Sequence, residues 1–220
     1  MESLFRIYCA GPLFNPQERQ EMAEIASMLR ASNYAVFLPQ EDGLEFARLF
    51  PTLLERGFAA GESRKILNLA IFSLDVYEII DCDGLLLNMN GRVPDEGAMV
   101  EAGIAWAHNK PVVIFNSDDR SLLQGSCNPL VVGLSNFEVV SEYSQIPVMF
   151  KDRFSQLGDT IIRESAFQFE DTKDKGRTIS EYINAQRNQD ELAELLITLF
   201  GAQSCSKDRK MNGTNPNMQQ

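Results

Sequence analysis

The sequence has 220 residues and a mass of 24.7 kDa, which suits one domain of ordinary size, alone or with an appendage, and is too short for a full α/β barrel. Hydrophobic residues make up 44% of the chain, so it can bury a core and is neither disordered throughout nor collagen-like. Its formal net charge of −11 repels the phosphates of nucleic acids and of anionic membranes, so we expect neither as a partner.

Short apolar runs alternate with longer helical patterns as far as residue 140, and they predict the elements in chain order. Strands are expected at 5–9, 35–38, 84–88, 111–115 and 137–140, and helices at 16–31, 63–80 and 95–109. Continuous apolar runs are typical of parallel strands buried on both faces. We therefore predict an α/β fold of the flavodoxin-like type, a doubly wound five-stranded parallel sheet with strand order 2-1-3-4-5 and an added C-terminal helix.

In such a sheet a ligand binds at the carboxyl ends of the first and third strands, where the strand order reverses. The loops that follow Tyr8 and Leu87 are therefore the predicted position of a site. The first of these loops reads YCAGPLF, and the chain has neither a P-loop nor a G-x-G-x-x-G pattern, so a phosphate cradle is poorly supported.

Beyond the predicted sheet, the charge-rich segment 163–177 and a capping box at 178–181 precede a helix that reaches roughly residue 200. The leucines of this helix either pack on the core or form a subunit interface. We predict a main domain at 1–162, a charged linker and C-terminal helix at 163–200, and a disordered tail at 201–220.

Histidine and cysteine usage excludes several kinds of site. The one histidine, His108, leaves no multi-histidine metal site and in practice no Ser-His-Asp triad. The four cysteines, at 9, 82, 127 and 205, form no C-x-x-C pair, so we expect reduced thiols. The first residues do not resemble a secretion signal, and we interpret the protein as cytoplasmic.

The segment 95–109 places a carboxylate in the middle of an apolar helix. Apolar side chains surround Glu101 in nearly every direction of the helical period, and Gly97 and Gly103 leave space beside it. Burying an unpaired carboxylate is costly or raises its pKa, so we interpret Glu101 as a nucleophile or base in a pocket wall. The alternative is a structural carboxylate, solvated in a groove or paired with Arg92.

Four more acids lie near the third predicted strand. Asp75 is on an apolar stripe of its helix, Asp81 and Asp83 come just before the strand, and Asp95 either caps the next helix or faces the crevice. Paired carboxylates in a dry crevice suit work on a glycosidic bond, where one attacks the anomeric carbon and another handles the leaving-group proton.

Three segments carry further motifs. They read IYCAGPLFNPQER at 7–19, DCDGLLLNMNG at 81–91 and GRVPDEGAMVEAGIAWAHNKPVVIF at 91–115. The most specific part is G-x-x-x-E-x-G-x-A in a P-D-x-G context, found together with Y-x-A-G-P near the start. By these motifs, over roughly residues 5–140, the sequence resembles the nucleoside 2-deoxyribosyltransferases.

The resemblance implies a catalytic domain at 1–162 that moves a 2-deoxyribosyl group between nucleobases by a retaining double displacement. Glu101 would attack C1′ of a deoxyribonucleoside and form a covalent ester, which a second base then attacks. Tyr8 would orient this nucleophile, and Asp75 and Asp95 would stand at the departing base. The substrates would be nucleosides and free nucleobases, and neither a metal nor a cofactor would be required.

The resemblance also assigns residues to substrate binding. In the first loop, Gly11 and Phe14 would contact the substrate, with Phe14 against the base. Asn128 and Leu130 are similar to the family's Asn-x-Met segment, which reaches into a neighbouring subunit's site and holds the 5′-hydroxyl, with Leu130 in place of the usual methionine. Asn128 would therefore act in trans, within a homo-oligomer.

Two alternatives stay open. One is an N-glycoside hydrolase of the same superfamily, such as the deoxynucleoside 5′-monophosphate hydrolases, whose Gly/Ser/Arg-rich first loop is missing at 10–14. The other is a nucleoside-sensing module without catalysis. The presence together of Glu101, Asp75, Asp95 and Tyr8 favours an enzyme, because a mere binder has no need for a buried acid beside the sugar.

Overall fold

The computed structural model describes residues 5–44, 46–91, 95–118 and 127–157, together with Thr178 and Ala185. The chain divides into two compact units, Met1–Ser165 and Ala166–Gln220, and the architecture below is that of the first. Apart from Thr178 and Ala185, the predicted linker and C-terminal helix at 163–200 and the tail at 201–220 lie outside the described residues.

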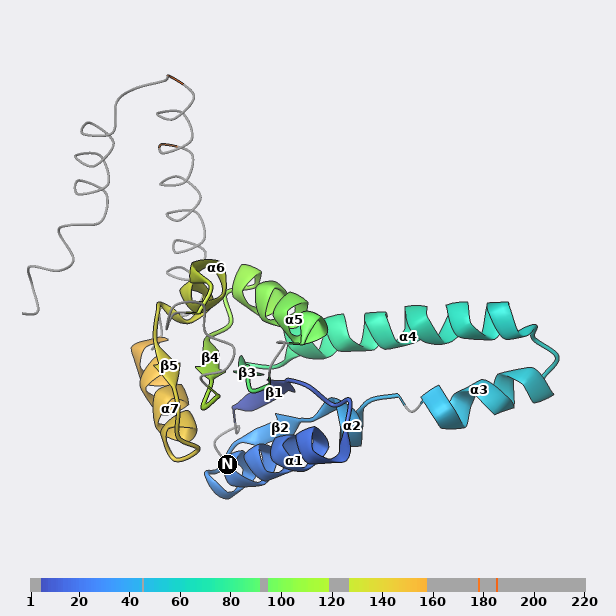
Figure 1. The fold of residues 1–220 in the computed structure, drawn as a ribbon, viewed down its shortest axis with the longest axis horizontal. Helices are drawn as coiled ribbons and strands as arrows, with labels where there is room; N and C mark the ends of the chain where they lie inside the picture. The colour runs from blue at the N-terminus through green and yellow to red at the C-terminus, as the bar shows by residue number, and fades with distance from the viewer. Residues whose placement is uncertain are drawn as a thin grey trace, which may run out of the picture. The chain divides into compact units, whose positions relative to one another are not determined.

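One parallel sheet forms the centre of the first unit, with five strands in the predicted order β2-β1-β3-β4-β5 (Figure 1). The strands are β1 (Arg6–Ala10), β2 (Ala35–Phe37), β3 (Gly84–Asn88), β4 (Val112–Phe115) and β5 (Val139–Val140). All four pairings are parallel, and the order reverses between β1 and β3. The α/β fold class and the strand order predicted from the sequence are confirmed.

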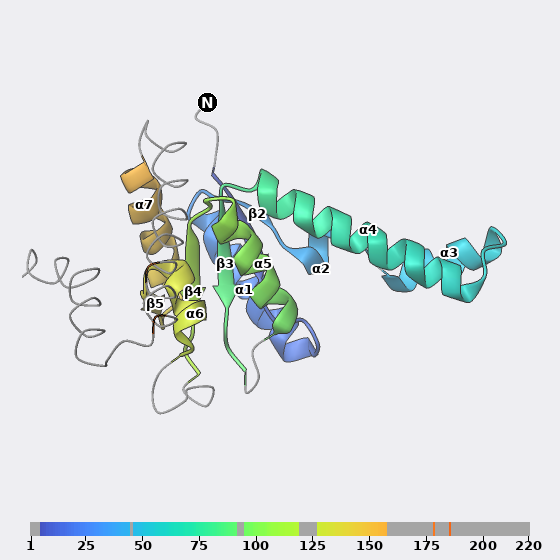
Figure 2. The same ribbon diagram turned by 90° about the horizontal axis from the view of Figure 1, so that it is seen from above.

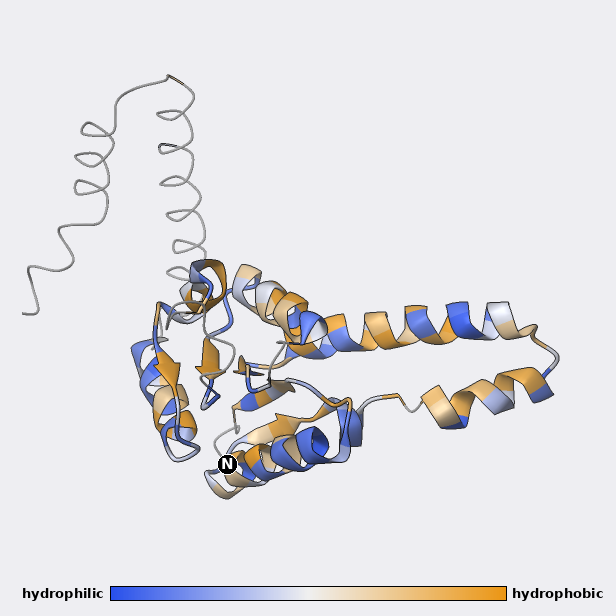
Figure 3. Ribbon diagram, in the orientation of Figure 1, coloured by the Kyte–Doolittle hydropathy of each residue, from blue (hydrophilic) through white to orange (hydrophobic). Residues whose placement is uncertain are grey.

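Helices cover both faces of the sheet (Figure 2). On one face, α1 (Pro16–Ala31) and α7 (Gln145–Leu157) share a buried cluster with Ile7, Cys9 and Leu86. On the other, α4 (Ala60–Asp81) and α5 (Glu96–Ala107) share a cluster with Tyr8 and Leu87. Because successive side chains of a strand point to opposite faces, Tyr8 is directed toward α5. Figure 3 shows apolar strands between helices of mixed character.

The predicted helix at 16–31 has the observed bounds of α1, because its start is strongly specified. Asn15 accepts hydrogen bonds from the backbone N–H groups of Gln17 and Glu18 at 3.0 and 2.9 Å. The Glu18 carboxylate accepts in return from the backbone of Asn15 at 3.2 Å, and Pro16 occupies the first turn. This reciprocal cap fixes where the loop after β1 ends.

Other bounds differ from the prediction. Helix α4 begins at Ala60, three residues before the predicted start, because Glu62 caps the backbone N–H of Ala59 at 3.2 Å. Helices α2 (Pro39–Asp42) and α3 (Phe46–Glu55) were not predicted; α3 contains Pro51, which disguises the helical pattern. Helices α3 and α4 lie side by side as a hairpin that extends from the sheet (Figures 1 and 2).

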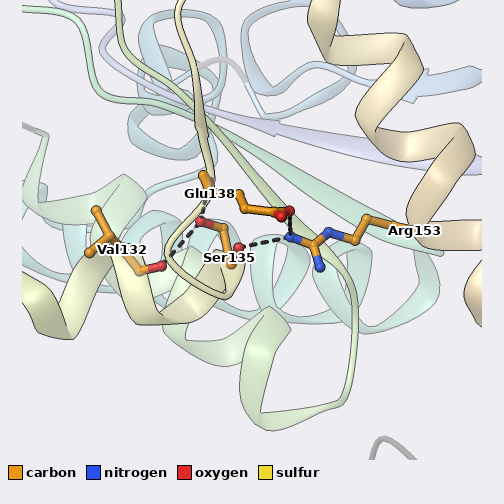
Figure 4. Close-up of polar contacts among 4 residues, drawn as sticks. All are labelled: Val132, Ser135, Glu138 and Arg153. Atoms are coloured by element: carbon orange, nitrogen blue, oxygen red, sulfur yellow. Dashed lines mark hydrogen bonds and ion pairs between the residues drawn. The ribbon is translucent and has the colours of Figure 1, made fainter. Parts of the chain in front are cut away.

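Between β4 and β5 lie α6 (Pro129–Val132) and the 3-10 turn η2 (Gly133–Ser135), which Ser135 and Arg153 hold in place (Figure 4). The buried hydroxyl of Ser135 lies 3.1 Å from the carbonyl oxygen of Val132 and 2.6 Å from that of Glu138. The Arg153 guanidinium donates to the Ser135 carbonyl at 2.8 Å and to the Glu138 carboxylate at 2.6 Å. These bonds fasten the α6 segment to α7.

Within the described part of the chain, every helix is too short or too polar to cross a bilayer.

Candidate active site

The residue pair at the centre of the candidate site is Tyr8 and Glu101. The hydroxyl of Tyr8, on β1, donates to Oε1 of Glu101, on α5, at 2.8 Å. The Tyr8 side chain is fully buried, and its ring stacks on Phe37, its register partner on β2, with centroids 5.3 Å apart and 19° between planes. The structure therefore brings together the predicted nucleophile and the residue predicted to orient it.

Several effects act on the pKa of Glu101. Burial, the largest, raises the pKa to about 7, and the hydrogen bond from Tyr8 opposes it by stabilising the ionised form. The negative charges of Asp75 and Asp95 add to the increase. Near neutral pH this carboxylate is therefore divided between its two forms, and the ionised form is poorly solvated, which suits a nucleophile.

Asp75 lies on α4, partly buried on the side of the helix that faces this pair. Burial raises its pKa, and its charge acts on both Tyr8 and Glu101. The burial of Tyr8 itself, with the charges of Glu101 and Asp75, raises the pKa of Tyr8, so that hydroxyl keeps its proton. A carboxyl group with a raised pKa can hold a proton for a leaving base.

Asp95 caps α5. Its Oδ1 accepts the backbone N–H of Gly97 at 2.8 Å, which is the capping alternative considered from the sequence. The charge of Asp95 also raises the pKa of Glu101. Asp95 therefore both caps α5 and acts on Glu101 through its charge.

The surroundings of α5 differ from the sequence prediction. The helix was expected to be buried on most sides, but only its narrow face of Ala98, Ala102 and Ala105 is buried, and Val100 is 61% exposed. Helix α5 covers the face of the sheet that carries Tyr8 and Leu87, and the side of the helix that points away from the sheet is exposed to solvent. Glu101 is partly buried because it lies beside the alanine face and against Tyr8, not because apolar neighbours surround the helix.

The β1–α1 loop carries two predicted substrate contacts. Gly11 is buried, and a Cβ there would lie 2.6 Å from Sδ of Met22 and 2.9 Å from Cβ of Asn88. Only glycine allows the loop to lie this close to the end of β3. Phe14 is 77% exposed, and its backbone N–H donates to the Glu18 carboxylate at 2.8 Å.

Asn128 and Leu130 lie at the start of α6. Oδ1 of Asn128 accepts from the backbone N–H of Leu130 at 2.9 Å, so Asn128 caps its own helix. The Leu130 side chain is 81% exposed. The contribution of Asn128 to a neighbouring subunit stays a prediction.

Two of the acids near β3 lie away from the site. Asp83 accepts the backbone N–H of Arg6 at 2.7 Å, and Asp81 pairs with the Arg6 guanidinium at 2.9 Å. Both lie at the amino end of β3, so of the four acids predicted near this strand only Asp75 and Asp95 act on Glu101. Arg92, the alternative partner of Glu101, lies outside the described residues.

Two features of the site were not predicted from the sequence: Phe37, whose ring supports Tyr8, and a polar network formed by Glu21, Asn88 and Asn90. The signal for the network is the asparagine that ends the apolar run of β3. Among the described residues, no group of three histidine, cysteine, aspartate or glutamate side chains is arranged to hold a metal ion.

Comparison with known proteins places these features in a family. Residues 7–200 match the family model described as Nucleoside 2-deoxyribosyltransferase. No curated protein matches the sequence.

Several solved structures are similar. A conserved protein from Enterococcus faecalis V583 has a TM-score of 0.53 at 22% identity, covering 69% of this chain and 99% of its own, and shares the fold. A 2-deoxyribosyltransferase from Bacillus psychrosaccharolyticus has a TM-score of 0.47 at 22% identity, covering 64% and 90%. A CMP N-glycosidase from Clostridium botulinum has a TM-score of 0.39 at 15% identity, covering 66% and 96%.

Proposed function

Since the chain belongs to the nucleoside 2-deoxyribosyltransferase family, we propose that it transfers the 2-deoxyribosyl group from one nucleobase to another through a covalent ester on Glu101. Membership of this family makes the chain an enzyme that acts on N-glycosidic bonds. The observation that supports the finer proposal is the hydrogen bond of 2.8 Å between Tyr8 and a partly buried Glu101. A structural carboxylate on a helix surface has no need of a buried phenol to orient it.

In the first step a carboxylate oxygen of Glu101 attacks C1′ of the donor nucleoside. The bond between C1′ and the base nitrogen breaks, its electron pair stays on the base, and an ester forms. In the second step a nitrogen of the acceptor base attacks C1′ and gives up its proton to the acid that protonated the first base, while the ester bond breaks and returns the carboxylate. Two inversions at C1′ give net retention. A deoxyribosyl C1′ lacks an electron-withdrawing 2′-hydroxyl, so its oxocarbenium-like transition state forms more readily.

Tyr8 serves both steps. By donating to Oε1, the hydroxyl fixes the direction of the Glu101 carboxylate and leaves the other oxygen for attack on C1′. The same bond stabilises the negative charge when Glu101 leaves the sugar in the second step.

The departing base needs a proton as its bond to C1′ breaks. Asp75 is the acid best suited to supply it, because burial raises its pKa and its charge acts on Glu101. Asp95 has its Oδ1 engaged in capping α5, so its contribution is through its second oxygen or its charge.

The remaining parts of the proposal concern substrates and assembly. Phe14 packs against the base, Gly11 shapes the loop beneath it, and Asn128, with Leu130 beside it, binds the 5′-hydroxyl in the site of a neighbouring subunit of a homo-oligomer. The substrates are nucleosides and free nucleobases, not nucleic-acid polymers, and the enzyme works in the cytoplasm.

The test is an incubation with deoxyinosine or thymidine, with and without free adenine, followed by separation of the products. Formation of deoxyadenosine only when adenine is present supports transfer. Release of free base at the same rate without an acceptor means hydrolysis, and no turnover of any donor contradicts both activities. The Glu101→Gln variant, which keeps the shape of the side chain, is the control for background reactions.

A further inference from the structure

A carboxylate on α1 joins the loops at the carboxyl edge of the sheet. Oε2 of Glu21 accepts from the side-chain amide of Asn88 at 3.0 Å. Its Oε1 accepts from the amide of Asn90 at 2.6 Å and from the hydroxyl of Tyr143 at 3.2 Å. Asn88 is the buried last residue of β3, Asn90 begins the loop toward α5, and Tyr143 follows β5. We call these four residues the Glu21 clamp.

Further bonds extend the clamp to β4. Oδ1 of Asn88 accepts the backbone N–H of Asn90 at 2.9 Å, and Oδ1 of Asn90 accepts the backbone N–H of Ser117 at 2.8 Å. The next residue, Gly91, donates its backbone N–H to Asp118 at 3.3 Å. The first residues of the β3–α5 loop are therefore fixed by side chains from two other segments of the chain.

The clamp reaches the candidate site in two directions. The β1–α1 loop lies on it, because Gly11 packs against Asn88 and against Met22, the residue after Glu21. The β3–α5 loop leaves it at Gly91, and Asp95, whose charge acts on Glu101, follows four residues later in the sequence. The β1–α1 loop and the β3–α5 loop thus both contact residues that Glu21 holds.

We propose that Glu21 is a positioning residue for the glycosidic site, holding Asn88 and Asn90 so that the Gly11 loop and Asp95 keep their places beside Glu101. The inference rests on the proposed function and adds to it a residue on the opposite face of the sheet. It does not require Glu21 to touch a substrate.

A carboxylate is the group that this arrangement needs. Three donors converge on Glu21, and only a side chain with two acceptor oxygens and no hydrogen can satisfy them all. A glutamine of the same shape turns an NH2 group toward Asn88 or toward Asn90 and Tyr143, and so loses at least one bond.

The experiment compares Glu21→Gln with Glu24→Gln. Glu24 is exposed about one turn further along α1 and accepts from Gln20 at 2.9 Å. Its charge acts on Tyr143, but its replacement removes the same charge from the same helix without removing a hydrogen bond of the clamp. Glu21→Gln should lower kcat/KM about tenfold at temperatures well below its Tm. Glu24→Gln should stay within about twofold of the unchanged enzyme.

The pH dependence of kcat/KM separates positioning from a purely structural role. Tyr8 from β1, Asp75 from α4 and Asp95 from the start of α5 act on Glu101, and the charge of Asp95 raises its pKa. If Glu21→Gln lets Asp95 move away, the pKa of Glu101 falls and the acid limb of the profile moves to lower pH. Loss of global stability alone lowers the Tm and leaves the limb where it was.

Three results would overturn the inference: activity of Glu21→Gln within twofold of the unchanged enzyme, an equal loss in Glu24→Gln, or an acid limb that stays in place. If Glu21→Gln does not fold, Tyr143→Phe, which removes one donor of the three, must show the same direction of limb movement.

If the wild-type protein turns over no donor, the proposed function is refuted but the positioning role of the clamp is not. The clamp is then tested by hydrogen exchange. Glu21→Gln should speed exchange in segments 9–15, 89–91 and 95–99 relative to Glu24→Gln, and equal exchange in the two variants overturns the clamp.

Discussion

Replacing Glu101 by glutamine should abolish turnover and, at neutral and alkaline pH, make the protein more stable. In the folded protein the pKa of Glu101 is raised from 4.5 to about 7, mainly by burial. The folded protein therefore binds this proton more tightly than the unfolded chain does. The contribution of Glu101 to the free energy of unfolding is largest below pH 4.5, falls as the pH rises toward 7 and stays low above it.

The size of the effect follows from the two pKa values. Their difference of about 2.5, at 1.36 kcal/mol for each pH unit, corresponds to about 3 kcal/mol lost between the two ends of the window. Glutamine has no proton to lose, and its amide oxygen still accepts from Tyr8. The stability of Glu101→Gln relative to the unchanged protein should therefore increase by up to about 3 kcal/mol from pH 5 to pH 8.

Urea denaturation of both proteins at several pH values, at one protein concentration, measures the difference. In thermal unfolding the same change means that the Tm of Glu101→Gln, relative to that of the wild-type protein, rises by about 6 to 12 °C from pH 5 to pH 8. Glu96→Gln, which removes an exposed carboxylate from the first turn of the same helix, is the control and should show a much smaller change. A stability difference that is independent of pH, or that is largest in acid, would refute the claim that the carboxylate is desolvated.

Further predictions concern the groups around Glu101. Tyr8→Phe removes the bond that favours the ionised carboxylate, so the acid limb of kcat/KM should move up by about one pH unit; Tyr34→Phe, whose hydroxyl bonds Pro147 on the other face, is the control. Phe37→Leu removes the ring that supports Tyr8 and should move the limb in the same direction, with no further movement when it is combined with Tyr8→Phe. Asp75→Asn should lower kcat about a hundredfold with neutral donor bases and far less with 7-methyl-2′-deoxyguanosine, whose cationic base leaves without protonation; an equal loss with both donors would remove Asp75 from the acid role. Gly11→Ala places a methyl group 2.6 Å from Met22 and should destabilise the protein by about 1 to 3 kcal/mol in urea denaturation, while an unchanged midpoint would show that the loop is not tightly packed.

Hydrophobic periodicity predicted the sheet well because each strand is an apolar run of the length a buried parallel strand needs. The last strand was predicted at 137–140 but begins at Val139. Asn136 and Phe137 have φ values of 55° and 63°, a left-handed turn that the apolar pattern does not reveal. Helix α7 was not predicted, although its buried residues, Ile146, Phe150 and Phe154, recur every four residues along one stripe.

Part of the candidate site could also be predicted from local sequence patterns. Alternation along β1 puts Tyr8 on the face opposite Ile7 and Cys9, and the motif around Glu101 gave the other member of the pair. The Glu21 clamp was not readable, because Glu21 and Tyr143 are 122 residues apart and no local pattern connects them. The hydrogen bonds of the clamp join segments that come together only when the sheet has formed.

The small residues of α5 explain how its carboxylate is both desolvated and oriented. The fully buried residues of α5 are three alanines, Ala98, Ala102 and Ala105, and such small side chains let a helix lie close to the strands. At that distance the hydroxyl of Tyr8, rising from β1, reaches Oε1 of Glu101 at 2.8 Å. Leucines on this face would bury more apolar area but would move the helix outward and break the bond. Alanine at these three positions is therefore compatible with the bond that holds the Glu101 carboxylate beside β1.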